Sequence, residues 1–226
     1  MGSAANTEPE SLELNGRRIA VVASADLARS PRMVSHALSL ADAGADVELL
    51  GRLDRADGAS EQDLPTSLQD HPRVSIHSLR YRELETLSVA RLGLASIWRA
   101  FSLSRQLRSL PELDLVLVQN PPTLPSLPCV RRFCQKRKIP WIIDWHNTSH
   151  HVLMQKLGGR GLAVNHLRRI ESFNGTRATA HLAVSRGFGE FLADETGGGV
   201  LAWSFYDRPK QPSLVAPSSS LRRPLG

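Results

Sequence analysis

The segment 144–151 places one carboxylate, one indole and three imidazoles within eight residues. Histidine changes charge near neutral pH and can take a proton from a hydroxyl group, and a nearby carboxylate can orient the ring. We therefore take His146 as the candidate general base and Asp144 as its partner. Trp145 is a candidate for stacking on a sugar, because an aromatic ring combines an apolar face with a polar edge. Asn147 completes the predicted binding residues of this segment.

Two other interpretations of the segment stay open. His146 and His150 are four residues apart, a spacing that can hold a metal ion. No cysteine pair or separate carboxylate motif completes such a site in the sequence, so we expect no metal. The segment could also be a polar surface loop without a catalytic role.

A second group of candidates lies in residues 25–32, just before a predicted helix. Ser30 can cap the helix, and Pro31 is favoured in its first turn. Amide groups at a helix N-terminus attract anions, and Arg29 and Arg32 would add guanidinium donors. We predict a phosphate site formed by Arg29, Ser30 and Arg32, against the alternative of a capped helix with solvated arginines. A dinucleotide site is poorly supported, because the glycine pattern that it needs is missing here.

The third candidate segment, Gln-Asn-Pro-Pro at 119–122, follows an apolar stretch. Two prolines prevent a helix from starting at once. The amides of Gln119 and Asn120 offer donors and acceptors that suit sugar hydroxyls. A purely structural turn is the alternative.

Alternating apolar stretches and amphipathic segments must position these candidates. Strands are predicted at residues 18–23, 47–50, 74–79, 113–119, 141–144 and 181–184. Helices are predicted at residues 30–44, 84–109, 124–138, 161–175 and 185–195. This order predicts an α/β fold, a Rossmann-like doubly wound parallel sheet. Ligands bind beyond the carboxyl ends of the strands in such a sheet, where all three candidate segments fall.

Composition limits the remaining possibilities. Of 226 residues, 41% are hydrophobic and 22% charged, which is enough apolar material for a core, and two cysteines exclude a disulfide framework. Residues 1–70 carry a net charge of −6 and residues 71–226 one of +12, which gives +6 in total. We divide the chain into a polar tail (1–16), a Rossmann-like domain (17–206) and a Pro/Ser-rich linker or disordered tail (207–226).

The predicted helix 84–109 combines apolar residues with Trp98 and four arginines. A basic amphipathic helix with a tryptophan can lie in the interface of an anionic membrane. A crossover helix packed on the sheet is the alternative. The basic part of the chain also suits nucleic acid or a phosphorylated substrate.

Several spaced motifs together resemble the eukaryotic chitobiosyldiphosphodolichol β-mannosyltransferase family. They occur in the family's order, and the resemblance covers about residues 17–209. The motifs are residues 29–33 and 36–40, 119–122 with 125–126, 143–147 and 206–209.

The resemblance implies the N-terminal, acceptor-side half of a GT-B glycosyltransferase. Its members transfer mannose from GDP-mannose to dolichyl-diphosphate-linked di-N-acetylglucosamine, forming a β-1,4 bond with inversion. They do so on the cytosolic face of the endoplasmic reticulum and need no cofactor. Members of the family also have a membrane anchor and a second domain, and this second domain holds most of the donor. We find no counterpart of either in these 226 residues, and expect the chain to be inactive alone and peripheral or cytosolic.

Two other functions stay open. The chain could be a non-catalytic module that binds an acceptor or a second subunit. It could also be a basic nucleotide- or nucleic-acid-binding domain. We expect no nucleic acid, because aromatic residues are only 5% and no nucleic-acid motif occurs.

Overall fold

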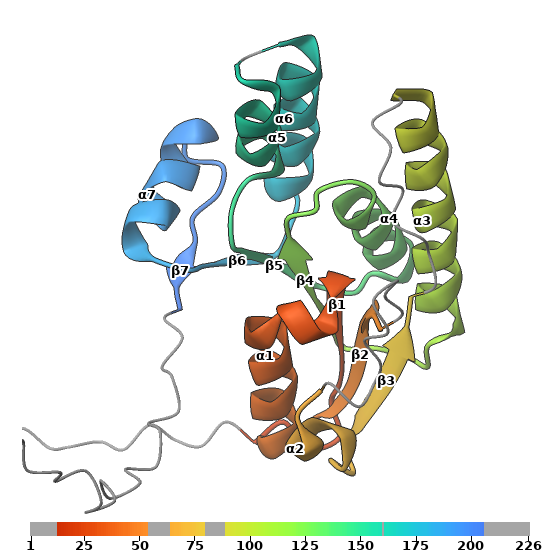
Figure 1. The fold of residues 1–226 in the computed structure, drawn as a ribbon. Helices are drawn as coiled ribbons and strands as arrows, with labels where there is room; N and C mark the ends of the chain where they lie inside the picture. Colours follow the sequence, from red (N-terminus) through yellow and green to blue (C-terminus); the bar gives the residue numbers. More distant parts are fainter. Residues whose placement is uncertain (1–12, 54–63, 80–88, 160, 206–226) are drawn as a thin grey trace, which may run out of the picture.

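The computed structural model describes residues 13–53, 64–79, 89–159 and 161–205 (Figure 1). The predicted tail 207–226 and most of the predicted tail 1–16 lie outside the described residues. The part of the first tail that is described touches the domain, because the amide of Leu14 donates to the carbonyl of Ala43 (2.8 Å).

One parallel sheet forms the centre of the described chain. Its order is β3-β2-β1-β4-β5-β6-β7, and every pairing is parallel. This arrangement confirms the predicted doubly wound α/β fold. The strands are β1 (Arg18–Asp26), β2 (Asp46–Arg52), β3 (Val74–Ser78), β4 (Leu115–Asn120), β5 (Trp141–Trp145), β6 (Ala180–Ala183) and β7 (Trp203–Ser204).

Helices cover both faces of the sheet (Figure 1). A 3₁₀ turn, η1 (Leu27–Arg29), leads from β1 into the first helix. The helices are α1 (Pro31–Asp42), α2 (Thr66–Gln69), α3 (Val89–Ser109), α4 (Ser126–Arg137), α5 (Ser149–Leu157), α6 (Leu162–Gly175) and α7 (Arg186–Glu195).

The two faces of the sheet belong to two separate cores. Neighbouring strand residues point to opposite faces, so Val21 joins the core that α1 and α2 cover. Val22 joins the core that α3, α4 and α7 cover. A strand buried on both faces is read in the sequence as a continuous apolar run, which is why β1 and β4 were predictable. None of the described helices combines the length and apolarity that crossing a bilayer requires.

Residues 84–88 of the predicted long helix lie outside the described residues, and α3 begins at Val89. The structure differs from the sequence predictions at three other places. Residues 66–69, for which the sequence analysis predicts no helix, form the short helix α2. Strand β7 was not predicted, because two exposed residues give no periodic signal. Only residues 146–148 of the predicted histidine-rich loop are irregular, because α5 already begins at Ser149.

The three candidate segments meet at one edge of the sheet, as predicted. Strands β1, β4 and β5 are neighbours, and the segments follow their carboxyl ends. Gln119 lies opposite Asp144 and Asn120 opposite Trp145 in the register of β4 and β5.

Candidate active site

The carboxylate of Asp144 is the centre of the site. Asp144 lies near the end of β5 and is fully buried. Arg32, in the first turn of α1, grips it with two parallel bonds, from Nε to Oδ2 (2.7 Å) and from Nη2 to Oδ1 (2.9 Å). Such a bidentate pair fixes the plane of the carboxylate as well as its position.

Two imidazoles complete the surroundings of this carboxylate. The Nε2 atoms of His36 and His146 lie 3.1 Å and 2.8 Å from Oδ2 of Asp144. His36 follows Arg32 by four residues, so both side chains lie on one face of α1. The backbone amide of His146 donates to the carbonyl of Asn120 (2.8 Å), which fixes the loop that carries the ring.

These contacts keep Asp144 ionised. Burial alone raises the pKa of the Asp144 carboxyl, but the hydrogen bonds from His146, His36 and Arg32 outweigh burial, so this pKa lies below its usual value. Asp144 is therefore a carboxylate that holds the two neighbouring rings in place. With Nε2 of His146 directed at the carboxylate, Nδ1 is the ring nitrogen left to accept a proton. The His146 side chain is 22% exposed, enough for contact with a substrate.

Phe205 also joins the cluster, from the segment that follows β7. Its carbonyl accepts a hydrogen bond from Nη1 of Arg32 (2.7 Å), and its amide donates to Ala183 in β6 (2.9 Å). The Phe205 ring lies 5.3 Å from the ring of His36, measured between centroids. Sequence reasoning missed Phe205, because a backbone carbonyl carries no signal in the residue type.

The predicted phosphate residues do not converge in the structure. Arg29 is exposed, whereas Arg32 is only 5% exposed and is committed to Asp144. Ser30 precedes α1, but its hydroxyl donates to the carbonyl of Asp26 (2.9 Å) and makes no capping bond within the described chain. The phosphate-binding role of these residues stays a prediction, with Arg29 as its accessible member.

The two predicted amides face opposite sides of β4. Gln119 lies beside Asp144, and its side chain is buried with Oε1 lacking a hydrogen-bond partner among the described residues. A buried acceptor without a donor costs about 1–3 kcal/mol, so a ligand hydroxyl there would recover free energy. Asn120 is fully buried and used internally: its Nδ2 donates to Glu171 (2.7 Å), and its Oδ1 lies 2.8 Å from the hydroxyl oxygen of Thr123.

Glu171 of α6 is a second buried hub, which sequence reasoning missed. Besides Asn120, its carboxylate accepts from Thr123 Oγ1 (2.7 Å) and from the amide of Ser149 (2.7 Å), and it lies 2.6 Å from Nδ1 of His150. Burial alone raises the pKa of Glu171, but the bonds from His150, Asn120 and Thr123 together place it below its usual value. The sequence does contain a signal that could have identified this residue, because Glu171 is the only acid between Asp144 and Glu190.

Trp145 and Asn147 occupy different environments. Trp145 is 1% exposed and belongs to the core, so its ring is not available for stacking on a sugar. Its Nε1 donates to Nδ1 of His181 (3.2 Å), whose pKa burial lowers to about 4, so that the imidazole is neutral and can accept. Asn147 is exposed, and its Oδ1 accepts from the amide of Thr148 (2.7 Å).

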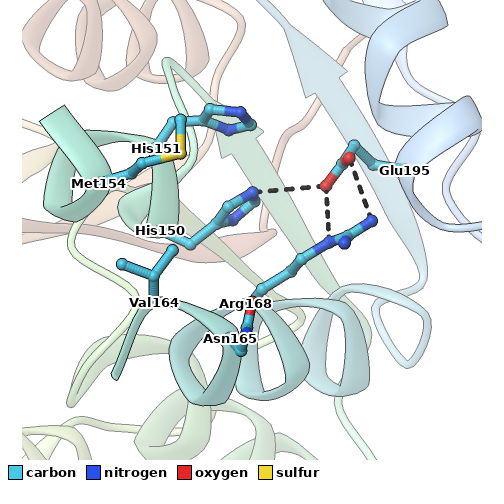
Figure 2. Close-up of a pocket in the computed structure, with 7 residues that line it drawn as sticks. All are labelled: His150, His151, Met154, Val164, Asn165, Arg168 and Glu195. Carbon is cyan, nitrogen blue, oxygen red and sulfur yellow. Dashed lines mark hydrogen bonds and ion pairs between the residues drawn. The ribbon is translucent and has the colours of Figure 1, made fainter. Parts of the chain in front are cut away.

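Beside His150 lies a small cavity of about 30 Å³ (Figure 2). His150 reaches across it to Glu195, with 3.4 Å between Nε2 and Oε2, and Arg168 pairs with the same carboxylate at 2.9 Å. The cavity is too small for a sugar. Among the described residues, no cluster of His, Cys, Asp and Glu has an arrangement that could hold a metal ion.

Comparison with known proteins places this site in context. Residues 29–199 match the profile of the glycosyl transferase 4-like domain. The chain is 37% identical over 142 residues to a chitobiosyldiphosphodolichol β-mannosyltransferase of Eremothecium gossypii, covering 63% of this chain and 29% of the relative. It is 33% identical over 196 residues to the protein of the same name from Kluyveromyces lactis, covering 85% and 41%. The chain thus spans well under half the length of these curated relatives.

Solved structures agree on the fold. Sucrose-phosphate synthase of Thermosynechococcus elongatus superimposes with a TM-score of 0.58 at 14% identity, covering 84% of this chain and 48% of the synthase. This likeness supports the expected correspondence to one half of a GT-B glycosyltransferase fold. Because the family profile matches more than half of its residues, the chain belongs to the glycosyl transferase 4-like domain family.

Proposed function

We propose that this chain is the acceptor-side domain of an inverting β-1,4-mannosyltransferase. The donor is GDP-mannose, and the acceptor is dolichyl-diphosphate-linked di-N-acetylglucosamine. The observation that carries the proposal is the half-buried His146, held by the buried carboxylate of Asp144 at the carboxyl edge of a glycosyltransferase-family sheet. The names of the curated relatives support this acceptor and the transfer of mannose.

Inversion requires one displacement and one base. The 4-hydroxyl oxygen of the terminal N-acetylglucosamine attacks the anomeric carbon of mannose, and the bond to the diphosphate breaks so that GDP leaves. The hydroxyl proton passes to Nδ1 of His146. Asp144 stabilises the imidazolium that forms, while Arg32 and His36 hold its carboxylate in place.

Acceptor recognition is assigned to the groups beside this pair. The unpaired Oε1 of Gln119 accepts a hydrogen bond from a hydroxyl group of the acceptor sugar. Asn147 and Arg29 are exposed near the same edge, and Arg29 is the guanidinium placed to meet a diphosphate. The donor is held mostly by a second domain, and no cofactor or nucleic acid takes part.

A lipid-linked acceptor implies that the chemistry takes place at a membrane, which we propose is the cytosolic face of the endoplasmic reticulum. The basic helix α3, with Trp98 63% exposed, is the first candidate for contact with that surface.

Mannose transfer tests the role of His146. We would join this chain to the part of the Kluyveromyces lactis relative that it does not match. The assay would supply GDP-mannose and a short-chain lipid-diphosphate chitobiose. We expect His146→Ala to lower kcat by about 10²–10⁴-fold, the usual contribution of a general base. The exposed His166 of α6 provides the control, and His166→Ala should leave kcat unchanged.

Near-normal turnover of His146→Ala would remove this residue from the mechanism. Acceptor binding by the chain alone, measured by calorimetry, separates the alternatives further. We expect Gln119→Leu to weaken this binding, because it removes the acceptor atom at similar size. Binding without any transfer by the unmodified chimera would favour the non-catalytic acceptor-binding module.

A further inference from the structure

Two helical prongs extend past the carboxyl edge of the sheet on one face. Helix α4 packs between α3 and α6 on that face. The 21 residues of α3 span about 30 Å, whereas the six residues of β4 span about 20 Å. Because α3 ends just before β4 begins, its N-terminal part must overhang the edge.

The second prong is the hairpin of α5 and α6. Helix α5 leaves the carboxyl end of β5, and α6 returns toward the sheet, so that Leu157 and Leu162 lie at the tip. Figure 1 shows the start of α3 and this tip at the same end of the molecule. Glu171 marks the level of the sheet edge, and Leu162 lies nine positions earlier in α6, a distance of about 13 Å along the helix.

Both prongs expose large apolar side chains. On the hairpin tip, Leu162 is 90% exposed and Leu157 is 61% exposed. On α3, Ile97, Trp98 and Phe101 are all more than half exposed, and the last two rings lie 6.1 Å apart between centroids. Exposed apolar side chains gathered in this way mark an interaction surface.

Within both helical segments, bases outnumber acids along the sequence. Residues 86–111 and 145–170 each contain four Lys or Arg residues and no Asp or Glu, although the chain has 22 acids in total. Lys156 near the tip of the hairpin is exposed, and so is Arg169 further along α6. Among the described residues, Glu195 of α7 pairs with Arg168 of the hairpin.

We propose that these two prongs dock on the interface of a lipid bilayer that carries anionic headgroups. Trp98, Leu157 and Leu162 enter the boundary between headgroups and acyl chains, and the surrounding bases meet lipid phosphates. A continuous anionic surface can engage two separate basic prongs at once, and tryptophan is enriched at that boundary. The proposal rests on the proposed function in one respect, since a lipid-linked acceptor requires the carboxyl edge to lie near the membrane.

Vesicle binding tests the proposal without any catalysis. The full chain would be sedimented with phosphatidylcholine vesicles that contain or lack phosphatidylserine, and neither kind would contain dolichol-linked sugar. We expect binding to the vesicles with phosphatidylserine, and we expect it to weaken as salt is added. The double variant Leu157→Ser/Leu162→Ser should bind about tenfold more weakly, and so should Trp98→Ser.

A matched control lies elsewhere on the surface. Trp203, in the edge strand β7, is 77% exposed, and Trp203→Ser should bind vesicles like the unchanged chain. All these side chains are exposed, so thermal unfolding of each variant should confirm an intact fold.

Three results would overturn the proposal: no binding to either vesicle, equal binding by the prong variants, or a prong-dependent self-association without vesicle binding. Mannose transfer to the short-chain acceptor is measured separately. Loss of vesicle binding with transfer intact would reject only the membrane surface. Loss of transfer with vesicle binding intact would reject only the proposed function.

Discussion

At the scale of single residues, Arg32 shows how position decides chemistry. In the sequence it is one of three polar residues at a helix start, where a phosphate-binding role is reasonable. In the structure its guanidinium is buried against Asp144, a residue 112 positions away. The same fork geometry that suits phosphate also suits carboxylate, so the residue type alone does not choose between them.

Replacing the guanidinium group of Arg32 should lower the stability of the fold. Arg32→Lys keeps the charge but cannot make two parallel bonds to Asp144, and we expect it to lower the free energy of unfolding by about 1–3 kcal/mol. Urea denaturation measures this change. Arg29→Lys, three residues earlier and exposed, is the matched control and should leave stability within about 0.5 kcal/mol. Equal effects of the two substitutions would show that the fork on Asp144 adds little.

At the scale of elements, one carboxylate joins three segments. The carboxylate of Glu171 in α6 accepts hydrogen bonds from the first amide of α5 and from two side chains. These are Asn120, the last residue of β4, and Thr123, which follows that strand. A negative charge at a helix N-terminus is stabilising, and this one comes from another helix. This contact explains why α5 begins at Ser149, inside a segment that local sequence predicts as a loop.

Neutralising the carboxylate of Glu171 should destabilise the contacts that join α5, α6 and the end of β4. We expect Glu171→Gln to lower the free energy of unfolding by about 3–5 kcal/mol, because it breaks a buried, fully bonded charge beside His150. Hydrogen exchange at the Ser149 amide should also become faster. Glu190→Gln provides the control, because Glu190 forms only an exposed pair with Arg186. Unchanged exchange at Ser149 in the first variant would contradict the role of Glu171 in starting α5.

At the scale of the whole molecule, two buried carboxylates make stability depend on pH. The pKa values of Asp144 and Glu171 are both lowered in the fold. The unfolded chain therefore binds more protons as pH falls through about 4, the ordinary range of Asp and Glu. Their stabilisation is fully present above that range and is lost progressively below it.

We accordingly expect the free energy of unfolding to change little from Asp144 and Glu171 between pH 7 and about pH 5, and to fall steeply at lower pH. Urea denaturation at a series of pH values checks this. In Glu171→Gln the slope below about pH 4 should be shallower, because one of the two linked groups no longer titrates. An identical slope in that variant would show that other carboxyls cause the acid sensitivity.

The site and the prongs also belong to this scale. Asp144 and Gln119 face the α1 side of the sheet, whereas α3, α4 and the α5–α6 hairpin lie on the other side. Both groups reach the same carboxyl edge. This arrangement would let the prongs contact a membrane while the α1 side stays open to a donor-binding partner domain.

The sequence by itself determined the fold and the edge where the candidates gather. Continuous apolar runs in β1 and β4 reveal strands buried on both faces, and parallel strands end at one edge. It also placed His146 beside Asp144, since only Trp145 separates them along the chain. These features depend on local periodicity and spacing, which are visible directly in the amino-acid sequence.

Only the tertiary structure decided what each polar side chain does. It turned Trp145 and Asn120 toward one core and left Gln119 with an unpaired oxygen beside Asp144. It also brought Arg32 and Phe205 into the cluster around Asp144, and Glu171 into the cluster beside Asn120. The physical reason is that a buried polar group must find a partner wherever the fold provides one, and those partners lie far apart along the chain.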